Sequence, residues 1–283
     1  MDINDYDLIK QIGKGSHGKV YKAVNFYTNK LVAIKTINIR GLPASKIDNI
    51  KTEIETMKKL SYPECNPFIV CYYDSQYNAD DQEFVISMEY IEGKDMSQFL
   101  KHRSKNDEEY YYYLLLITRD IAMGLDYVHK KGILHNDIKP ANIMIQKDTY
   151  IPKLIDFGLA CNLIHDKRYP SEYCLKPTGT PLYLAPEYFQ SNKGFKLPAS
   201  DMWSLGVTLY KTATGNDVYK AKTYADLVKE VKDFHIPKLN TSNELLNTIT
   251  NGLLRRNPND RLKPYQIIEL IDANIVKPKS LAK

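Results

Sequence analysis

Residues 135–142 read HNDIKPAN, and the interpretation of the whole chain starts from this segment. Pro140 lacks an N–H and fixes its own φ, so a regular helix cannot run through it. The segment follows a long helical pattern and precedes an apolar strand at 143–145. This predicts a shaped loop between rigid elements, where catalytic groups usually lie. The eight residues alone leave a polar surface turn open as the alternative.

Three side chains of this loop suit the transfer of a phosphate group. Asp137 can accept a proton from a hydroxyl nucleophile, and Lys139 can neutralise phosphate charge. Asn142 can ligate a hard metal ion through its carbonyl oxygen.

A fourth group follows further along the chain, where an apolar strand at 153–155 leads into Asp156. Together with the strand at 143–145 it predicts a hairpin that returns Asp156 to the side of Asn142. An aspartate and an asparagine side by side would make a Mg²⁺ site, completed by phosphate oxygens and water.

A glycine-rich segment lies near the N-terminus, where residues 13–20 read GKGSHGKV. Glycines let the backbone approach phosphates closely. A dinucleotide-binding fold would need a helix directly after such a segment. Residues 20–24 have the pattern of a strand instead, so we expect the glycines to form the tip of a hairpin. A flexible hairpin tip without a ligand is the alternative.

Lys35 ends an apolar strand at 32–34, and a buried ammonium group needs a partner. The next segment has apolar residues at helical spacing between Ile47 and Leu60. Glu53 flanks the inward stripe of that helix and is the predicted partner, whereas Glu55 is less favoured. A solvated strand end is the alternative for Lys35 taken alone.

The remaining pattern divides a single domain, residues 1–283, into two lobes. Strands expected at 68–73 and 83–90 complete a β-rich N-terminal lobe, residues 1–90. A helix expected at 108–131 begins the helical part of a C-terminal lobe, residues 91–271. We expect residues 272–283 to form a short basic tail.

Composition limits the class of protein. The net charge of +5 is modest and does not demand nucleic acid or membrane as a partner. No apolar run approaches the ~18 residues of a membrane span, and the N-terminus has no basic-then-apolar signal pattern. The four cysteines show no CxxC spacing, which favours reduced thiols in an intracellular, cytoplasmic protein over disulfides or a metal site.

These motifs together resemble the catalytic domain of eukaryotic protein kinases. They occur in the order and at the spacing of that family, and they cover nearly the whole chain. The matching segments are the glycine loop at 13–20, VAIK at 32–35, HNDIKPAN at 135–142, DFG at 156–158 and APE at 185–187. Residues 179–181, 200–206 and Arg261 match as well.

The resemblance implies an α+β, two-lobed protein kinase fold, with an N-terminal antiparallel sheet and one main helix and a mainly helical C-terminal lobe. It implies transfer of the γ-phosphoryl of ATP to serine or threonine hydroxyls of protein substrates, with ATP and Mg²⁺ as cofactors. The implied catalytic residues are Asp137, Lys139, Lys35 and Glu53, and the implied Mg²⁺ ligands are Asn142 and Asp156. The implied nucleotide-binding residues are Ile12, Gly13, Gly15, Gly18, Val20, Ala33, Lys35, Met88, Glu89, Ile91, Asp95 and Met144.

At three other positions, the resemblance implies a structural role rather than a catalytic one. Glu187 and Arg261 resemble a buried structural ion pair. Asp201 is expected to accept backbone hydrogen bonds from the loop at 135–142.

One position departs from the family's commonest pattern, which has arginine between the loop histidine and aspartate. This chain has Asn136 there, so the usual receiver for a phosphate on the segment 156–187 is missing. We therefore expect activity without phosphorylation of that segment. The alternative is that Arg168, Lys176 or another cation replaces the arginine.

Two other functions are weighed. A pseudokinase scaffold, which binds ATP without turnover, typically lacks a residue at one of four positions, and all four residues are present here: Lys35, Asp137, Asn142 and Asp156. A small-molecule kinase generally lacks an APE segment. We expect a monomer that acts on protein substrates and binds neither nucleic acid nor membrane.

Overall fold

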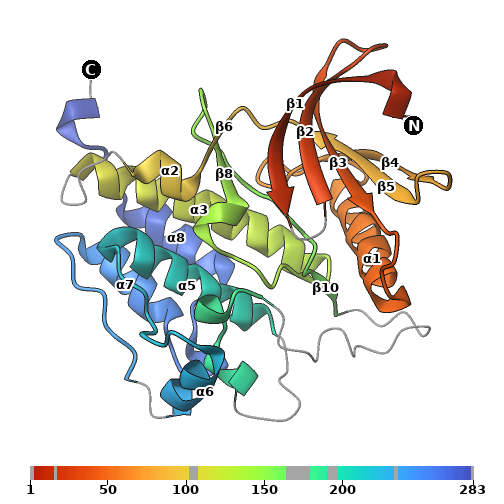
Figure 1. Cartoon of the computed structure of the whole chain (residues 1–283). Helices are drawn as coiled ribbons and strands as arrows, with labels where there is room; N and C mark the ends of the chain where they lie inside the picture. Colours follow the sequence, from red (N-terminus) through yellow and green to blue (C-terminus); the bar gives the residue numbers. More distant parts are fainter. Residues whose placement is uncertain are drawn as a thin grey trace. The chain divides into compact units, whose positions relative to one another are not determined.

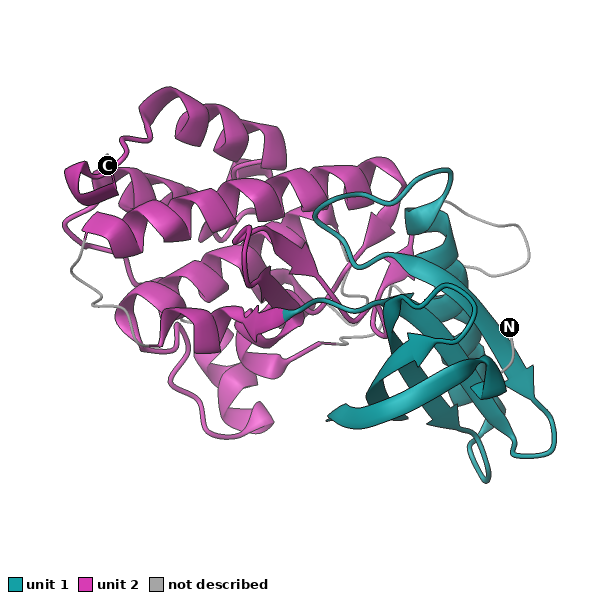
Figure 2. Ribbon diagram, turned by 90° about the horizontal axis from the view of Figure 1, so that it is seen from above, with its two compact units in different colours: residues 1–92 teal, residues 93–283 magenta. Residues whose placement is uncertain are grey.

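The structure is a computed structural model, and it describes residues 3–15, 18–101, 108–163, 179–189, 197–232 and 235–281. The chain divides into two compact units, Met1–Glu92 and Gly93–Lys283, called unit 1 and unit 2 (Figures 1 and 2).

Unit 1 is built on a five-stranded antiparallel sheet with the strand order β1-β2-β3-β5-β4. Its elements are η1 (Ile3–Asp5), β1 (Tyr6–Gly15), β2 (Gly18–Asn25), β3 (Leu31–Asn38), α1 (Ala44–Ser61), β4 (Tyr72–Asn78) and β5 (Glu83–Glu89). Asn25 shapes the turn between β2 and β3, because its side-chain oxygen accepts hydrogen bonds from the backbone N–H groups of Tyr27 and Thr28.

The glycine segment forms the end of the β1–β2 hairpin, as predicted. Gly13 pairs with Val20, and Gly15 pairs with Gly18. A Cβ atom at Gly18 would lie 2.0 Å from the backbone oxygen of Thr36 on β3. Only glycine therefore lets β2 lie this close to β3 at that point.

Helix α1 packs against β4 in unit 1 (Figure 1). Its inward face is apolar, and Ile50, Ile54, Met57 and Leu60 are all buried. The helical spacing in the sequence thus gives one packed face, and Glu53 lies on that same buried side.

Strand β4 differs from the prediction, which placed it at 68–73. The strand runs over Tyr72–Asn78. Ile69 and Val70 are buried without belonging to a strand. They are apolar because the loop is buried, and a short apolar run cannot distinguish a buried loop from a strand.

Unit 2 is mainly helical. Its helices are α2 (Met96–Leu100), α3 (Glu108–Lys130), α5 (Pro198–Thr214), α6 (Tyr224–Lys232), α7 (Glu244–Leu253) and α8 (Pro264–Asn274). Short strands form two small sheets: β6 (Gly93–Asp95), β8 (Ile143–Gln146) and β9 (Pro152–Leu154) in one, and β7 (Ile133–Leu134) and β10 (Cys161–Asn162) in the other. The 3₁₀ turns are η2 (Pro140–Asn142), η3 (Pro181–Tyr183), η4 (Pro186–Phe189), η5 (Pro258–Asp260) and η6 (Lys279–Leu281).

Two pairs of helices pack closely against each other in unit 2. Helix α3 packs against α8, and α5 packs against α7 (Figure 1). Gly132 closes the C-terminus of α3 in the left-handed conformation with φ 71°, and its N–H donates to the backbone oxygen of His129. Helix α5 is buried along most of its length, including Trp203.

No helix in the described ranges is both long enough and apolar enough to cross a membrane.

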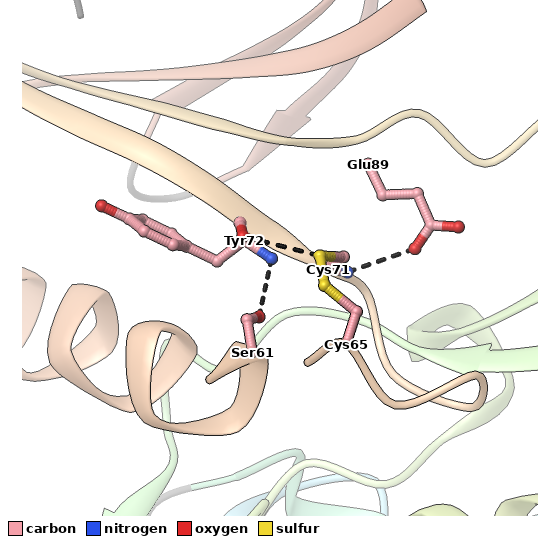
Figure 3. Close-up of a disulfide and its surroundings, with 5 residues drawn as sticks. All are labelled: Ser61, Cys65, Cys71, Tyr72 and Glu89. Atoms are coloured by element: carbon pink, nitrogen blue, oxygen red, sulfur yellow. Dashed lines mark hydrogen bonds between the residues drawn. A yellow bond between two sulfur atoms is a disulfide. The ribbon is translucent and has the colours of Figure 1, made fainter. Parts of the chain in front are cut away.

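The described cysteines differ from the prediction of reduced thiols. Cys65 and Cys71 form a disulfide, with their Cα atoms 5.4 Å apart (Figure 3), a separation that a disulfide can bridge. Cys161 is disulfide-bonded as well. The prediction of reduced thiols, which rested on the absence of CxxC spacing, is therefore wrong. The loop between α1 and β4 joins cysteines that are six positions apart.

Candidate active site

The loop at 135–142 is hydrogen-bonded to a buried carboxylate on α5. Asp201 accepts hydrogen bonds from the backbone N–H of His135 at 3.0 Å and from that of Asn136 at 2.9 Å. His129 Nε2 lies 2.8 Å from the same carboxylate. The expected support role of Asp201 is thereby confirmed.

Asp201 remains ionised despite its burial. Burial raises the pKa of this carboxyl, but the hydrogen bonds from His129 and from the backbone of Asn136 outweigh it, so the pKa lies below its ordinary value of 3.8. The loop is thus built around a fixed negative charge.

Both carboxylate oxygens of Asp137 accept hydrogen bonds. Lys139 Nζ donates to Oδ2 at 2.7 Å, and the hydroxyl and N–H of Thr180 donate to Oδ1 at 2.7 and 3.1 Å. Asn142 Nδ2 donates to Oδ2 at 2.8 Å. These four donors fix the direction in which the carboxylate points.

Burial raises the pKa of the Asp137 carboxyl. The hydrogen bonds from Lys139 and Thr180 and the charge of Lys139 lower this pKa by more, so it lies below its ordinary value of 3.8. The group is therefore an oriented anion at neutral pH. Its chemistry is to align a hydroxyl and receive its proton late, because a weak base accepts a proton only as the oxygen–phosphorus bond forms.

Lys139 connects Asp137 with the segment that follows the undescribed residues 164–178. Its Nζ atom also donates to Thr180 Oγ1 at 2.8 Å. Asp137, Lys139 and Thr180 thus form a closed triangle of hydrogen bonds.

The predicted hairpin brings Asp156 back to Asn142. Ile143 on β8 pairs with Leu154 on β9, and the N–H of Ile155 donates to the backbone oxygen of Asn142 at 3.0 Å. Asp156 has φ 63°, and its carboxylate accepts from the N–H of Gly158 at 3.3 Å.

The two residues fit a Mg²⁺ ion that is shared with phosphates. The Asn142 amide nitrogen donates to the backbone oxygen and carboxylate of Asp137, which leaves its carbonyl oxygen Oδ1 as the group suited to a metal. No three His, Cys, Asp or Glu side chains in the described part of the chain gather into a metal site. One carboxylate and one amide oxygen suit an ion that takes its other ligands from substrate and water.

Unit 1 holds the predicted Lys35–Glu53 ion pair. Lys35 Nζ lies 2.5 Å from Glu53 Oε1, and the two side chains are 14% and 4% exposed. Glu55, the rejected alternative, is 74% exposed and pairs with Lys58 at 3.6 Å. The helical period identified the correct glutamate because it separates the buried face from the solvated one.

The other predicted nucleotide-binding residues of unit 1 lie on β1, β2, β3 and β5, except Ile91, which follows β5. Val20 pairs with Lys35, and Ala33 pairs with Met88. Glu89 ends β5, Ile91 is 9% exposed and Ile12 is 44% exposed.

The predicted residues of unit 2, Asp95 and Met144, are partners in the β6–β8 ladder. The Asp95 carboxylate caps α2 by accepting from the N–H of Gln98 at 3.0 Å and from the Ser97 hydroxyl. Sequence reasoning missed this capping role, for which the signal was an aspartate followed by a helical pattern.

Asn136 makes contacts that sequence reasoning also missed. It adopts φ 64°, a left-handed conformation that asparagine tolerates better than most residues. Its Nδ2 donates to the backbone oxygen of Leu159 at 2.9 Å, and its Oδ1 accepts from the Tyr188 hydroxyl at 3.4 Å. The amide thus links the loop to segments on both sides of residues 164–178.

The predicted Glu187–Arg261 ion pair is present and bidentate. Arg261 Nη1 and Nη2 donate to the two carboxylate oxygens of Glu187 at 2.7 and 2.6 Å. The Arg261 side chain has no exposed surface, and its guanidinium lies 5.1 Å from the ring centre of Trp203. Backbone oxygens of Ala199, Arg255 and Arg256 accept its remaining hydrogen bonds.

Comparison with known proteins identifies the family of the chain. The protein kinase domain family model matches residues 6–270. The chain is 30% identical to the serine/threonine-protein kinase Nek5 of Homo sapiens over 92% of its length, covering 35% of that protein. It is 30% identical to the serine/threonine-protein kinase TIO of Arabidopsis thaliana over 93%, and 33% identical to the serine/threonine-protein kinase atg1 of Dictyostelium discoideum over 82%. It spans 18% and 33% of those two relatives. The predicted fold class is confirmed, and the chain belongs to the protein kinase family, in its serine/threonine class.

Proposed function

We propose that this chain is an active protein kinase that transfers the γ-phosphoryl of ATP to serine or threonine hydroxyls of protein substrates. The observation that carries the proposal is the Asp137 carboxylate, held on one side by Lys139 and on the other by Thr180. Such a group is ready to orient a short alcohol.

Each residue has a role in this reaction. Asp137 would align the substrate hydroxyl and take its proton while the oxygen–phosphorus bond forms and the γ-phosphorus leaves the bridging oxygen of ADP. Lys139 would neutralise charge on the transferred group. Because the transition state of phosphoryl transfer is loose, such positioning and charge neutralisation supply most of the catalysis.

Each unit, taken by itself, carries residues that are proposed to bind the cofactors. Asn142 and Asp156 would ligate Mg²⁺, which neutralises phosphate charge when it is bound. Lys35, held by Glu53, would contact the α- and β-phosphates. Gly13, Gly15 and Gly18 would cover the phosphates with backbone N–H groups. The adenine would lie against Ile12, Val20, Ala33, Met88 and Met144, with its edge bonded by the backbone of Glu89 and Ile91. Asp95 would reach the ribose or a basic residue of the substrate.

The proposal includes a monomeric enzyme that acts on proteins and binds neither nucleic acid nor membrane. A cytoplasmic, intracellular location fits a reaction that consumes ATP. A pseudokinase scaffold is the second candidate.

Transfer of ³²P from labelled ATP to a generic protein substrate separates the two candidates. We expect label on the substrate with Mg²⁺ present and at least a hundredfold less when the metal is chelated, about 2.7 kcal/mol in barrier. ATP binding without transfer would favour the scaffold. A control with chelator followed by excess Mg²⁺ should restore transfer and excludes damage by the chelator.

We further propose that activity does not require phosphate on residues 156–187. A phosphate orders such a segment by pairing with arginine, and Asn136 offers only neutral hydrogen bonds. Those bonds already tie the loop to Leu159 and to Tyr188 without a phosphate. The hydroxyl residues of this segment include Tyr169, Ser171, Tyr173 and Thr178, which lie outside the described residues, as do the cations Arg168 and Lys176.

We expect phosphatase-treated protein to keep its activity within about tenfold, or 1.4 kcal/mol in barrier. The measurement is the initial rate after mass spectrometry confirms that residues 156–187 carry no phosphate. A larger drop that rephosphorylation restores would show that a cation elsewhere replaces the missing arginine.

A further inference from the structure

The Cys65–Cys71 disulfide lies where the loop after α1 reaches the end of β5 (Figure 3). Residues 62–71 have almost no regular secondary structure, so few backbone hydrogen bonds of their own hold them in place. Cys71 is 6% exposed, whereas Cys65 is exposed. The disulfide therefore joins a solvent-facing point of the loop to a buried one.

Cys71 contacts Glu89 at two points. The N–H of Glu89 donates to the backbone oxygen of Cys71 at 2.8 Å. The N–H of Cys71 donates to the Glu89 carboxylate at 3.2 Å (Figure 3). Both backbone groups of Cys71 thus bond to one residue, and the bond between the Glu89 N–H and the Cys71 oxygen continues the β4–β5 ladder past the pair of Tyr72 and Met88.

The next residue is fixed to α1. The N–H of Tyr72 donates to the hydroxyl of Ser61, the last residue of that helix, at 2.8 Å (Figure 3). Cys71 therefore lies between an anchor on α1 and the end of β5. The disulfide restrains the loop that enters this position, because it closes the stretch between Cys65 and Cys71 into a ring.

We propose that the Cys65–Cys71 disulfide is a positioning element for Glu89, acting through the two hydrogen bonds of Cys71. This rests on the proposed function, which gives the backbone of Glu89 a bond to the adenine edge. The disulfide should then favour ATP binding more than the chemical step, because Glu89 is assigned to the adenine edge, whereas Asp137 and Lys139, which would act on the hydroxyl and the transferred phosphoryl, lie in unit 2.

The bond can be opened by a dithiol. Its thiolate attacks the disulfide, a mixed disulfide forms, and the second thiol closes a cyclic disulfide. The reductant loses two electrons, and Cys65 and Cys71 gain two electrons and two protons. A low-molecular-weight disulfide such as oxidised glutathione reverses the change and leaves as two thiols. Cys65 is the exposed residue of the pair, so we expect a reagent to approach the disulfide from its side.

The test compares kinetics of the oxidised and reduced protein at saturating protein substrate. We expect reduction to raise the KM for ATP about fivefold, the effect of one hydrogen bond of ordinary net strength, with kcat changed less than about twofold. Non-reducing mass spectrometry after alkylation reports the state of the two cysteines independently of activity. Reoxidation should restore the lower KM.

Three variants assign the effect. Cys65→Ser, at an exposed position, should fold and show the higher KM with no further response to the dithiol. Cys161→Ser should keep the response, which excludes reduction of the other disulfide as the cause. Glu89→Ala removes the carboxylate that accepts from Cys71, so its KM should respond less than that of the original chain.

Several results would overturn the proposal. They are unlinked Cys65 and Cys71 in the oxidised protein, an unchanged KM after verified reduction, or a full response in Glu89→Ala. A fall in kcat with constant KM would assign the disulfide to general stability instead. Absence of phosphoryl transfer in the oxidised sample, in which mass spectrometry shows the Cys65–Cys71 disulfide, would instead be a failure of the proposed function.

Discussion

Asp137→Asn is expected to lower the rate of phosphoryl transfer by about 10²–10⁴-fold, the usual cost of losing a positioned acid–base group. Asparagine has nearly the same shape, so the bonds to Thr180 and Lys139 can persist in part while the negative charge and the proton acceptor are lost. The measurement is kcat for a generic protein substrate at matched concentrations of folded protein.

A matched control is Asp126→Asn, because Asp126 on α3 pairs only with the exposed Lys130 among the ion pairs of the described residues. It should leave kcat unchanged. Lys35→Met should also nearly abolish transfer, and Lys58→Met on α1 is its control. Near-normal turnover by Asp137→Asn or Lys35→Met would contradict the role assigned to that residue.

Arg261→Gln is expected to reduce the free energy of unfolding by about 3–5 kcal/mol, because it leaves the Glu187 carboxylate without its buried partner. The guanidinium also satisfies three backbone oxygens, so the loss is not confined to one ion pair. Chemical denaturation measures the change.

The control is Arg119→Gln. Arg119 pairs with Asp272 between α3 and α8, but the two side chains are 31% and 48% exposed, so we expect a loss of about 0–1 kcal/mol. Equal losses in the two variants would contradict the structural importance given to burial of the Glu187–Arg261 pair.

Part of the site was predicted from local periodicity, and part, such as the Glu187–Arg261 ion pair and the support of the loop by Asp201, from the resemblance to the kinase family. The helical period selected Glu53 over Glu55, and the exposed fractions of 4% and 74% show why the two faces of α1 differ. The hairpin of β8 and β9 followed from two apolar runs around a turn, and it returned Asp156 to Asn142.

The parts that sequence reasoning missed depend on long-range contacts or on loops. Ile69 and Val70 predicted a strand, because burial within a loop leaves the same apolar signature. The disulfide of Cys65 and Cys71 arises from the path of that same loop. Asn136 was identified by the charge that it lacks, whereas its bonds to Leu159 and Tyr188 require the fold to bring distant segments together.

The chemical identity of the phosphorylated product tests the central claim most directly. The dephosphorylated protein is incubated with γ-labelled ATP, Mg²⁺ and a mixed protein substrate, and the product is hydrolysed and separated into phosphoamino acids, with Asp137→Asn as the blank. The triangle of Asp137, Lys139 and Thr180 predicts labelled phosphoserine and phosphothreonine well above the blank. Label mainly on phosphotyrosine, or no label above the blank, would contradict it.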